Sequence, residues 1–201
     1  MDDSTRLRQG LCRLLTQAEI DFEMWQAMRD EKGNKKFQGK LNRYSRFYIA
    51  AENALFNSLI IILYKTVENR RDTININSYK KSLSGNISED TQLALSETEK
   101  RIKPLVTKIC ILRNNIVGHQ SVSLDAGDVY DKADLWVSEI SQLISDLQEL
   151  VYILAKDVQD THVTFNLKGT QSFKNLVDDL TCEQTNVGVT NSRPLFVPHN
   201  V

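Results

Sequence analysis

A heptad-like apolar repeat in the second half of the chain constrains the fold most strongly. Between residues 133 and 154, apolar side chains recur at alternating steps of three and four residues, the spacing of one helix face. They are Ala133, Trp136, Ile140, Leu143, Leu147, Leu150 and Leu154, flanked by Val137, Ile144 and Val151. This segment predicts one long amphipathic helix, whose seam packs either on the second apolar helix of the chain or across a dimer.

Earlier segments show the same helical periodicity, and we therefore predict an all-α protein, a bundle of four to five helices that forms a two-fold dimer. The helix that begins near residue 40 is apolar nearly all round in its second half, which predicts the central core helix. Pro104 either kinks the helix that approaches residue 117 or starts a new one. Helices are expected at about 4–28, from 40 to beyond 62, at 78–83, from 88 through 117, and at 172–180.

Length and composition favour one domain in a reducing compartment. The 201 residues suit a single core, with 1–180 as the domain and 181–201 as a poorly ordered tail. Three cysteines lie far apart, which suits neither a disulfide framework nor a zinc site. No leader opens the chain, and its most apolar run, 55–64, is shorter than a membrane span. We expect a cytoplasmic protein without a membrane partner, a metal or another cofactor.

Arg113 occupies a helix face that is otherwise apolar. It follows Ile109 by four residues on that face, and a buried guanidinium there is costly unless it is paired. His119 stands six residues further on, directly after Gly118. An arginine binds phosphate oxygens with a permanently charged planar fork, and a histidine titrates near neutrality. This combination of residue types suits phosphodiester cleavage.

Arg113 and His119 would not meet on one unbroken α-helix. Six residues turn through roughly 600°, which leaves the two side chains about 120° apart and about 9 Å apart along the axis. Either Gly118 ends the helix and brings His119 back, or a second copy of the chain contributes its own pair to a shared site. The second arrangement requires a homodimer.

The order of Arg, a polar residue, four more residues and His at the end of a long helix resembles the HEPN superfamily. The pairs Arg113-Asn114 and Gly118-His119 make it most similar to the abortive-infection, phage-defence branch. The resemblance implies a metal-independent endoribonuclease that cleaves RNA by 2′-hydroxyl attack, in phage defence or in a toxin-antitoxin system with a cognate antitoxin protein. Arg113 and His119 would be catalytic, and Asn114 would position one of them. Some HEPN toxins are silenced through a tyrosine two residues after the histidine, and Ser121 stands there instead.

The alternative is a non-catalytic dimerisation or protein-interaction module, in which Arg113 forms a structural ion pair with a carboxylate such as Glu52 or Glu68. Glu68 also lies where relatives place an acidic residue that orients the Arg or His. Because the formal net charge is −1, any RNA contact needs a local basic patch. Its candidates are Lys36, Lys100, Arg101 and Lys108, although solvated surface is the commoner meaning of such basic runs. The chain has no glycine-rich phosphate loop and no Gly-x-Ser-x-Gly elbow, which argues against ATP hydrolysis and acyl transfer.

Overall fold

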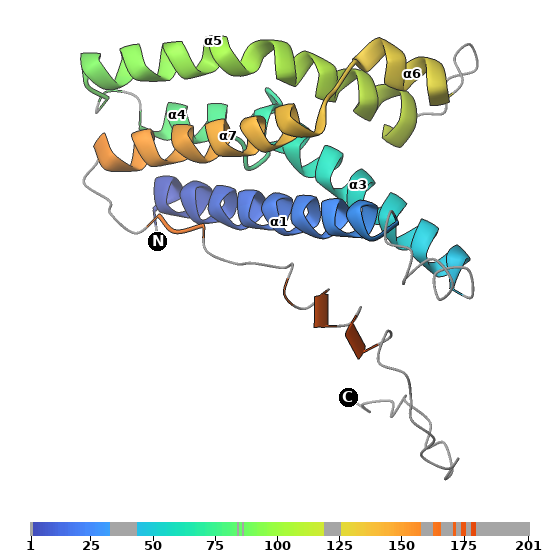
Figure 1. The fold of residues 1–201 in the computed structure, drawn as a ribbon. Coiled ribbons are helices and arrows are strands. Elements are labelled where there is room, and N and C mark those ends of the chain that lie inside the picture. The colour runs from blue at the N-terminus through green and yellow to red at the C-terminus, as the bar shows by residue number, and fades with distance from the viewer. Residues whose placement is uncertain are drawn as a thin grey trace.

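The computed structural model describes residues 2–32, 44–83, 85, 87–118, 126–157 and 163–165, and single residues between 171 and 179. Over this part of the chain every regular element is a helix, which confirms the all-α prediction (Figure 1). The elements are α1 (Asp3–Lys32), α3 (Ser45–Val67), α4 (Ile76–Ser82), α5 (Glu89–Leu112), the π-helical segment η1 (Arg113–Gly118), α6 (Ala126–Ala133) and α7 (Val137–Asp157). The tail 181–201 lies outside the described residues, and of the helix expected at 172–180 only Lys174, Asn175, Asp178 and Asp179 are described, all helical.

Helix α7 lies between α1 and α5, and α3 crosses this layer at the C-terminal end of α1 (Figure 1). The apolar seam of α7 is buried against α5 and α1: Ile140, Leu143, Leu147, Leu150 and Leu154 are at most 2% exposed. The seam therefore packs inside one chain. Helix α7 contacts α5 and α1 most, whereas the sequence suggested the second apolar helix or a dimer mate as its partner.

The long helix expected from 133 to 154 is in fact two helices. Helix α6 ends at Ala133, and Asp134 adopts a left-handed conformation with φ of 43°. Trp136 then precedes α7, and its backbone N–H donates to Glu139 Oε2 at 2.9 Å, which caps the new helix. The break leaves Trp136 66% exposed, outside the seam. Because the connecting residues preserve the alternating steps of three and four, the spacing concealed the break.

The second half of α3 belongs to the main core, and near its start Tyr48 is buried against Met28 of α1. Leu59, Ile60 and Leu63 are fully buried, whereas Phe47 and Ile49 near its start are 71% and 53% exposed. Within the described residues, α3 is the one helix that is long and apolar enough to cross a membrane. Core helices of soluble proteins meet the same criterion, and α3 packs on α1 and α5. The cytoplasmic location stays a prediction.

Helix α5 runs through Pro104 without interruption, so its 24 residues carry the motif at their C-terminal end. Its N-terminal end is fixed to α7 by Asp157. This carboxylate accepts from the Ser88 N–H and hydroxyl, both at 2.8 Å, and from the Thr91 hydroxyl at 2.9 Å. The two helices are thereby held together at the end opposite to the motif.

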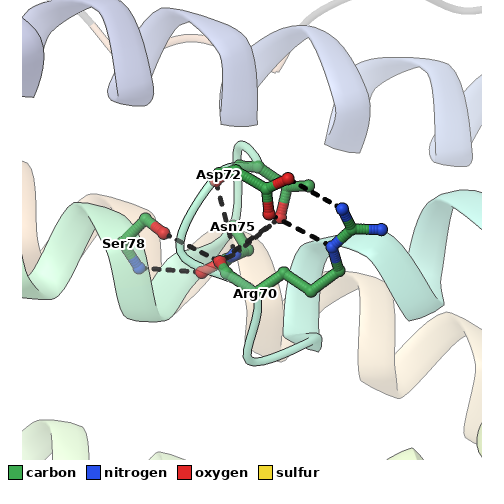
Figure 2. A network of polar contacts seen from close by, with 5 residues as sticks. Arg70, Asp72, Asn75 and Ser78 are labelled. Atoms are coloured by element: carbon green, nitrogen blue, oxygen red, sulfur yellow. Dashed lines mark hydrogen bonds and ion pairs between the residues drawn. The ribbon is translucent and has the colours of Figure 1, made fainter.

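The connection between α3 and α4 is organised by Asn75, whose side chain is fully buried (Figure 2). Its amide donates to the Arg70 carbonyl at 2.7 Å, and its Oδ1 accepts from the Ser78 N–H at 2.7 Å, capping α4. Arg70 and Asp72 form an exposed ion pair beside it. Ile74 and Ile76 alternate as in a short strand, but α4 begins at Ile76, directly after the Asn75 cap, so this segment is not extended into a strand.

Candidate functional site

Arg113 begins η1, the π-helical segment that continues α5 and ends at Gly118. Such segments occur mostly as single turns within α-helices and are frequent at functional sites. Their bonds join residues five apart, so the α-helical angles calculated from the sequence do not apply to the motif. Helices α3 and α6 both contact η1, which places the motif where three helices meet.

The Arg113 guanidinium lies over the Tyr64 ring of α3, with Cζ 4.7 Å from the ring centroid. Its Nη1 also donates to Asn114 Oδ1 at 3.0 Å. Arg113 is half-buried, and no carboxylate of the described residues forms an ion pair with it. The expected structural pair with Glu52 or Glu68 is therefore replaced by an aromatic ring, which positions the charge without neutralising it.

The neighbours of Arg113 differ in their exposure and chemistry. Asn114 is exposed, whereas Asn115 is half-buried and donates to the Ile111 carbonyl at 2.8 Å. Burial raises the pKa of the Cys110 thiol, and the Arg113 charge opposes this rise only in part. Cys110 is therefore a neutral thiol at pH 7 and a poor nucleophile. Among the described side chains around Arg113, Asn114 is the one that faces solvent and contacts the guanidinium.

Two predicted site residues, His119 and Lys36, lie outside the described residues. The approach of His119 to Arg113, whether within one chain or across a dimer, therefore stays a prediction. Glu68 follows the last residue of α3, and its backbone N–H donates to the Tyr64 carbonyl at 2.9 Å. Glu68 thus stands one turn beyond the ring that holds Arg113.

The basic residues predicted to bind RNA lie on α5 and differ in their contacts. Arg101 pairs with Asp146 and Glu149 of α7, its Nε donating to Asp146 Oδ1 at 3.0 Å. Lys108 donates to the two Glu139 carboxylate oxygens at 2.8 and 2.9 Å and to the Asp134 carbonyl. Lys100 is exposed. Arg101 and Lys108 thus join α5 to α7, and the binding of RNA by all three stays a prediction.

An aromatic cleft of about 290 Å³ lies beside the motif, between α1, α3, α6 and the start of α7. Trp25, Phe56, Tyr130 and Trp136 line it, together with Leu112, the residue before Arg113. The sequence did not predict this cleft, because Trp136 was expected in the buried apolar seam, whereas it is 66% exposed. Elsewhere in the described structure, no group of three His, Cys, Asp or Glu side chains is placed to hold a metal ion.

Comparison with known proteins gives one finding. The family model HEPN_AbiU2, described as AbiU2, matches residues 1–178. No curated protein and no solved structure matches the chain. The matched residues include every helix from α1 to α7 and the whole Arg113 to His119 motif.

Proposed function

Because the chain belongs to the AbiU2 family of HEPN proteins, we propose that it is an endoribonuclease that acts in abortive infection. The observation that carries the proposal is the setting of Arg113. Its guanidinium is oriented by the Tyr64 ring and by Asn114, and no carboxylate among the described residues competes for it. A guanidinium that is held but not neutralised can bind a phosphate through its planar fork.

The proposed reaction is attack of a ribose 2′-hydroxyl on the adjacent phosphorus. His119 removes the hydroxyl proton as the new P–O2′ bond forms, and the protonated imidazole returns a proton to the 5′-oxygen as the P–O5′ bond breaks. Arg113 stabilises the negative charge that builds on the non-bridging oxygens, and Asn114 positions the guanidinium. The products are a 2′,3′-cyclic phosphate and a 5′-hydroxyl, and no metal takes part.

The proposal also includes a homodimer, in which two copies of the motif line one shared site. The HEPN resemblance supports this arrangement. A cognate antitoxin protein and a phage-linked trigger belong to the same proposal. Both would explain how a ribonuclease is tolerated by the cell that makes it.

The test is cleavage of a labelled RNA and of a DNA of matched sequence, with EDTA present throughout. Wild type, Arg113→Ala and His119→Ala are compared with Arg71→Ala, which removes the same charge from an exposed position on the α3–α4 connection. We expect wild type and Arg71→Ala to cut only RNA and to leave a 2′,3′-cyclic phosphate, identified by mass spectrometry. Cleavage of DNA, inhibition by EDTA, or full activity of Arg113→Ala would overturn the proposal.

One observation favours a second candidate, a non-catalytic interaction module. Phe47 and Ile49 leave an apolar surface exposed at the start of α3, of the kind that binds proteins. A folded, dimeric wild type that leaves every RNA intact, and whose dimer dissociates on Phe47→Ser, would support this candidate. The ribonuclease proposal instead expects wild type to cleave RNA. It also expects Phe47→Ser to cleave RNA as wild type does, provided that the variant still forms a dimer.

A further inference from the structure

The aromatic cleft beside the motif has the size of a site for one small planar group. Its volume of about 290 Å³ is just below the roughly 300–1,000 Å³ typical of small-molecule sites. The Phe56 ring is tilted against Trp25 at a centroid distance of 5.2 Å and against Tyr130 at 6.1 Å. Trp136 stands at the mouth with two-thirds of its surface exposed. Tyr130 is also exposed, whereas Trp25 is buried, so the cleft presents the Tyr130 and Trp136 rings to solvent.

Polar groups accompany these rings. The Arg29 guanidinium lies over the Trp25 ring, with Cζ 4.8 Å from its centroid, and Arg29 lines the cleft. Asn53 is exposed in the lining, and its amide can both donate and accept hydrogen bonds. Burial raises the pKa of the Tyr130 phenol, against the opposing charge of Arg29, so the hydroxyl stays neutral at pH 7. Aromatic faces, an amide and a cation are together the groups that bind a base and its phosphate.

The cleft lies within a short length of nucleic acid from Arg113. Leu112 lines it, and Arg113 is the next residue. On α3, Phe56 in the cleft precedes Tyr64 under Arg113 by eight residues, which is about 12 Å along the helix. An extended single strand with a phosphate at Arg113 could therefore place a nearby base in the cleft.

The exposed wall of the cleft is held in place by ion pairing. Lys108 donates to the Asp134 carbonyl and to the Glu139 carboxylate, and Glu139 in turn accepts from the Trp136 N–H. Burial works against ionisation of Glu139, but the hydrogen bonds from Lys108 and Trp136 outweigh it and lower the pKa of Glu139. These contacts hold the residue that carries the exposed indole, which favours a preorganised site.

We propose that this cleft binds an unpaired base of single-stranded RNA, one or two nucleotides from the phosphate at Arg113. The proposal rests on the ribonuclease function and names its substrate class. A base in a duplex is stacked and paired, so it is not free to enter the cleft. The enzyme would therefore select loops, bulges and unpaired ends.

The experiment measures binding without cleavage. The probe is a fluorescently labelled 2′-O-methyl RNA hexamer, which has no attacking hydroxyl, and its anisotropy is titrated with the full chain. Trp136→Ala is compared with Trp136→Phe and with Tyr152→Ala, which removes a 55% exposed ring from α7 outside the cleft. Loss of one base-stacking ring should weaken binding by roughly 5- to 100-fold, whereas phenylalanine should restore most of it. Tyr152→Ala should bind as wild type does.

Competition identifies what the cleft recognises. A nucleoside monophosphate should displace the probe at lower concentration than ribose 5-phosphate, and an RNA duplex of the same sequence should compete poorly. Equal competition by ribose 5-phosphate or by the duplex would overturn the proposal. Unchanged binding of the probe by Trp136→Ala would also overturn the proposal. If this variant in addition runs as a monomer in size-exclusion chromatography, the cleft is a protein interface.

The two proposals fail separately. A wild type that binds the probe through Trp136 but cuts no RNA would retain the cleft and reject the ribonuclease. A wild type that cuts RNA through Arg113, and whose Trp136→Ala variant binds the probe equally well, would retain the ribonuclease and reject the cleft.

Discussion

Replacing Arg113 by alanine removes a guanidinium that is half-buried over the Tyr64 ring and strands no buried carboxylate of the described residues. A cation–π contact contributes about 0.5–2 kcal/mol, depending on how far it is desolvated. For a protein near 200 residues, each kcal/mol shifts Tm by roughly 2–4 °C. Arg113→Ala should therefore lower Tm by about 1–8 °C, while RNA cleavage falls by a factor on the order of 10²–10³ through loss of phosphate stabilisation.

The assay is a thermal melt followed by circular dichroism, on the same preparations that are used for cleavage. Arg101→Ala is the matched contrast, because it leaves the buried Asp146 carboxylate without its cation. Arg101→Ala should thus lower Tm by more than Arg113→Ala does. A loss of about 3–5 kcal/mol for Arg113→Ala would be that of a broken buried ion pair, and it would refute the assignment of Arg113 to the active site. Arg113→Lys should melt near wild type but cleave poorly, since it keeps the charge and loses the planar fork.

Two further predictions concern stability. Hydrogen bonds from Ser88 and Thr91 hold the pKa of Asp157 in the folded protein below its usual range. Ionised Asp157 therefore stabilises the fold fully above the pKa of the unfolded chain, near 4, and this stabilisation is lost as the pH falls through the lower pKa of the folded protein. Asp157→Asn should lower Tm at pH 7, and below about pH 4 the Tm of the variant should decrease less with falling pH than the Tm of wild type does. A Tm difference between variant and wild type that is the same at all pH values would contradict this. Asn75→Ala should cost about 1–3 kcal/mol in urea unfolding, because it removes the α4 cap and leaves the Arg70 carbonyl with only the longer contacts from the Thr73 and Ser78 hydroxyls, both at 3.4 Å. A cost below about 0.5 kcal/mol would show that the Asn75 network of Figure 2 is dispensable.

Helical periodicity predicted the elements whose stripes are buried, since burial is what selects the spacing. The seam from Ile140 to Leu154 is buried as expected, and the partners of the seam were not predictable because a stripe does not specify which helix covers it. Arg113 could be singled out for the same reason: a charged side chain interrupts an apolar face. Its contact with Tyr64 could not be predicted, because residues 49 positions apart meet only through the packing of α3 on η1.

Charge patterns were a poorer guide than apolar patterns. Arg101 and Lys108 belong to a basic run in the sequence, but the carboxylates of α7 lie across from them and form ion pairs with both. A run of basic residues shows where positive charge lies along one helix. The acidic residues of the neighbouring helix determine how much of that charge is left unpaired to bind RNA. The π-helical form of η1 was equally hidden, since a single π-helical turn has no marker in the residues themselves.

The exposure of Trp136 connects the concealed break to the proposed base site. In an unbroken helix Trp136 would extend the buried seam, and burying the exposed two-thirds of an indole would contribute roughly 2.5–4 kcal/mol. The left-handed turn at Asp134 gives up this free energy, and Lys108 and Glu139 hold the turn in place. A simple connection between α6 and α7 does not require an indole exposed to solvent, whereas a surface that binds a ligand does. Trp136→Ala should therefore leave stability nearly unchanged while it weakens RNA binding, and a large loss of stability would instead assign the indole to the fold.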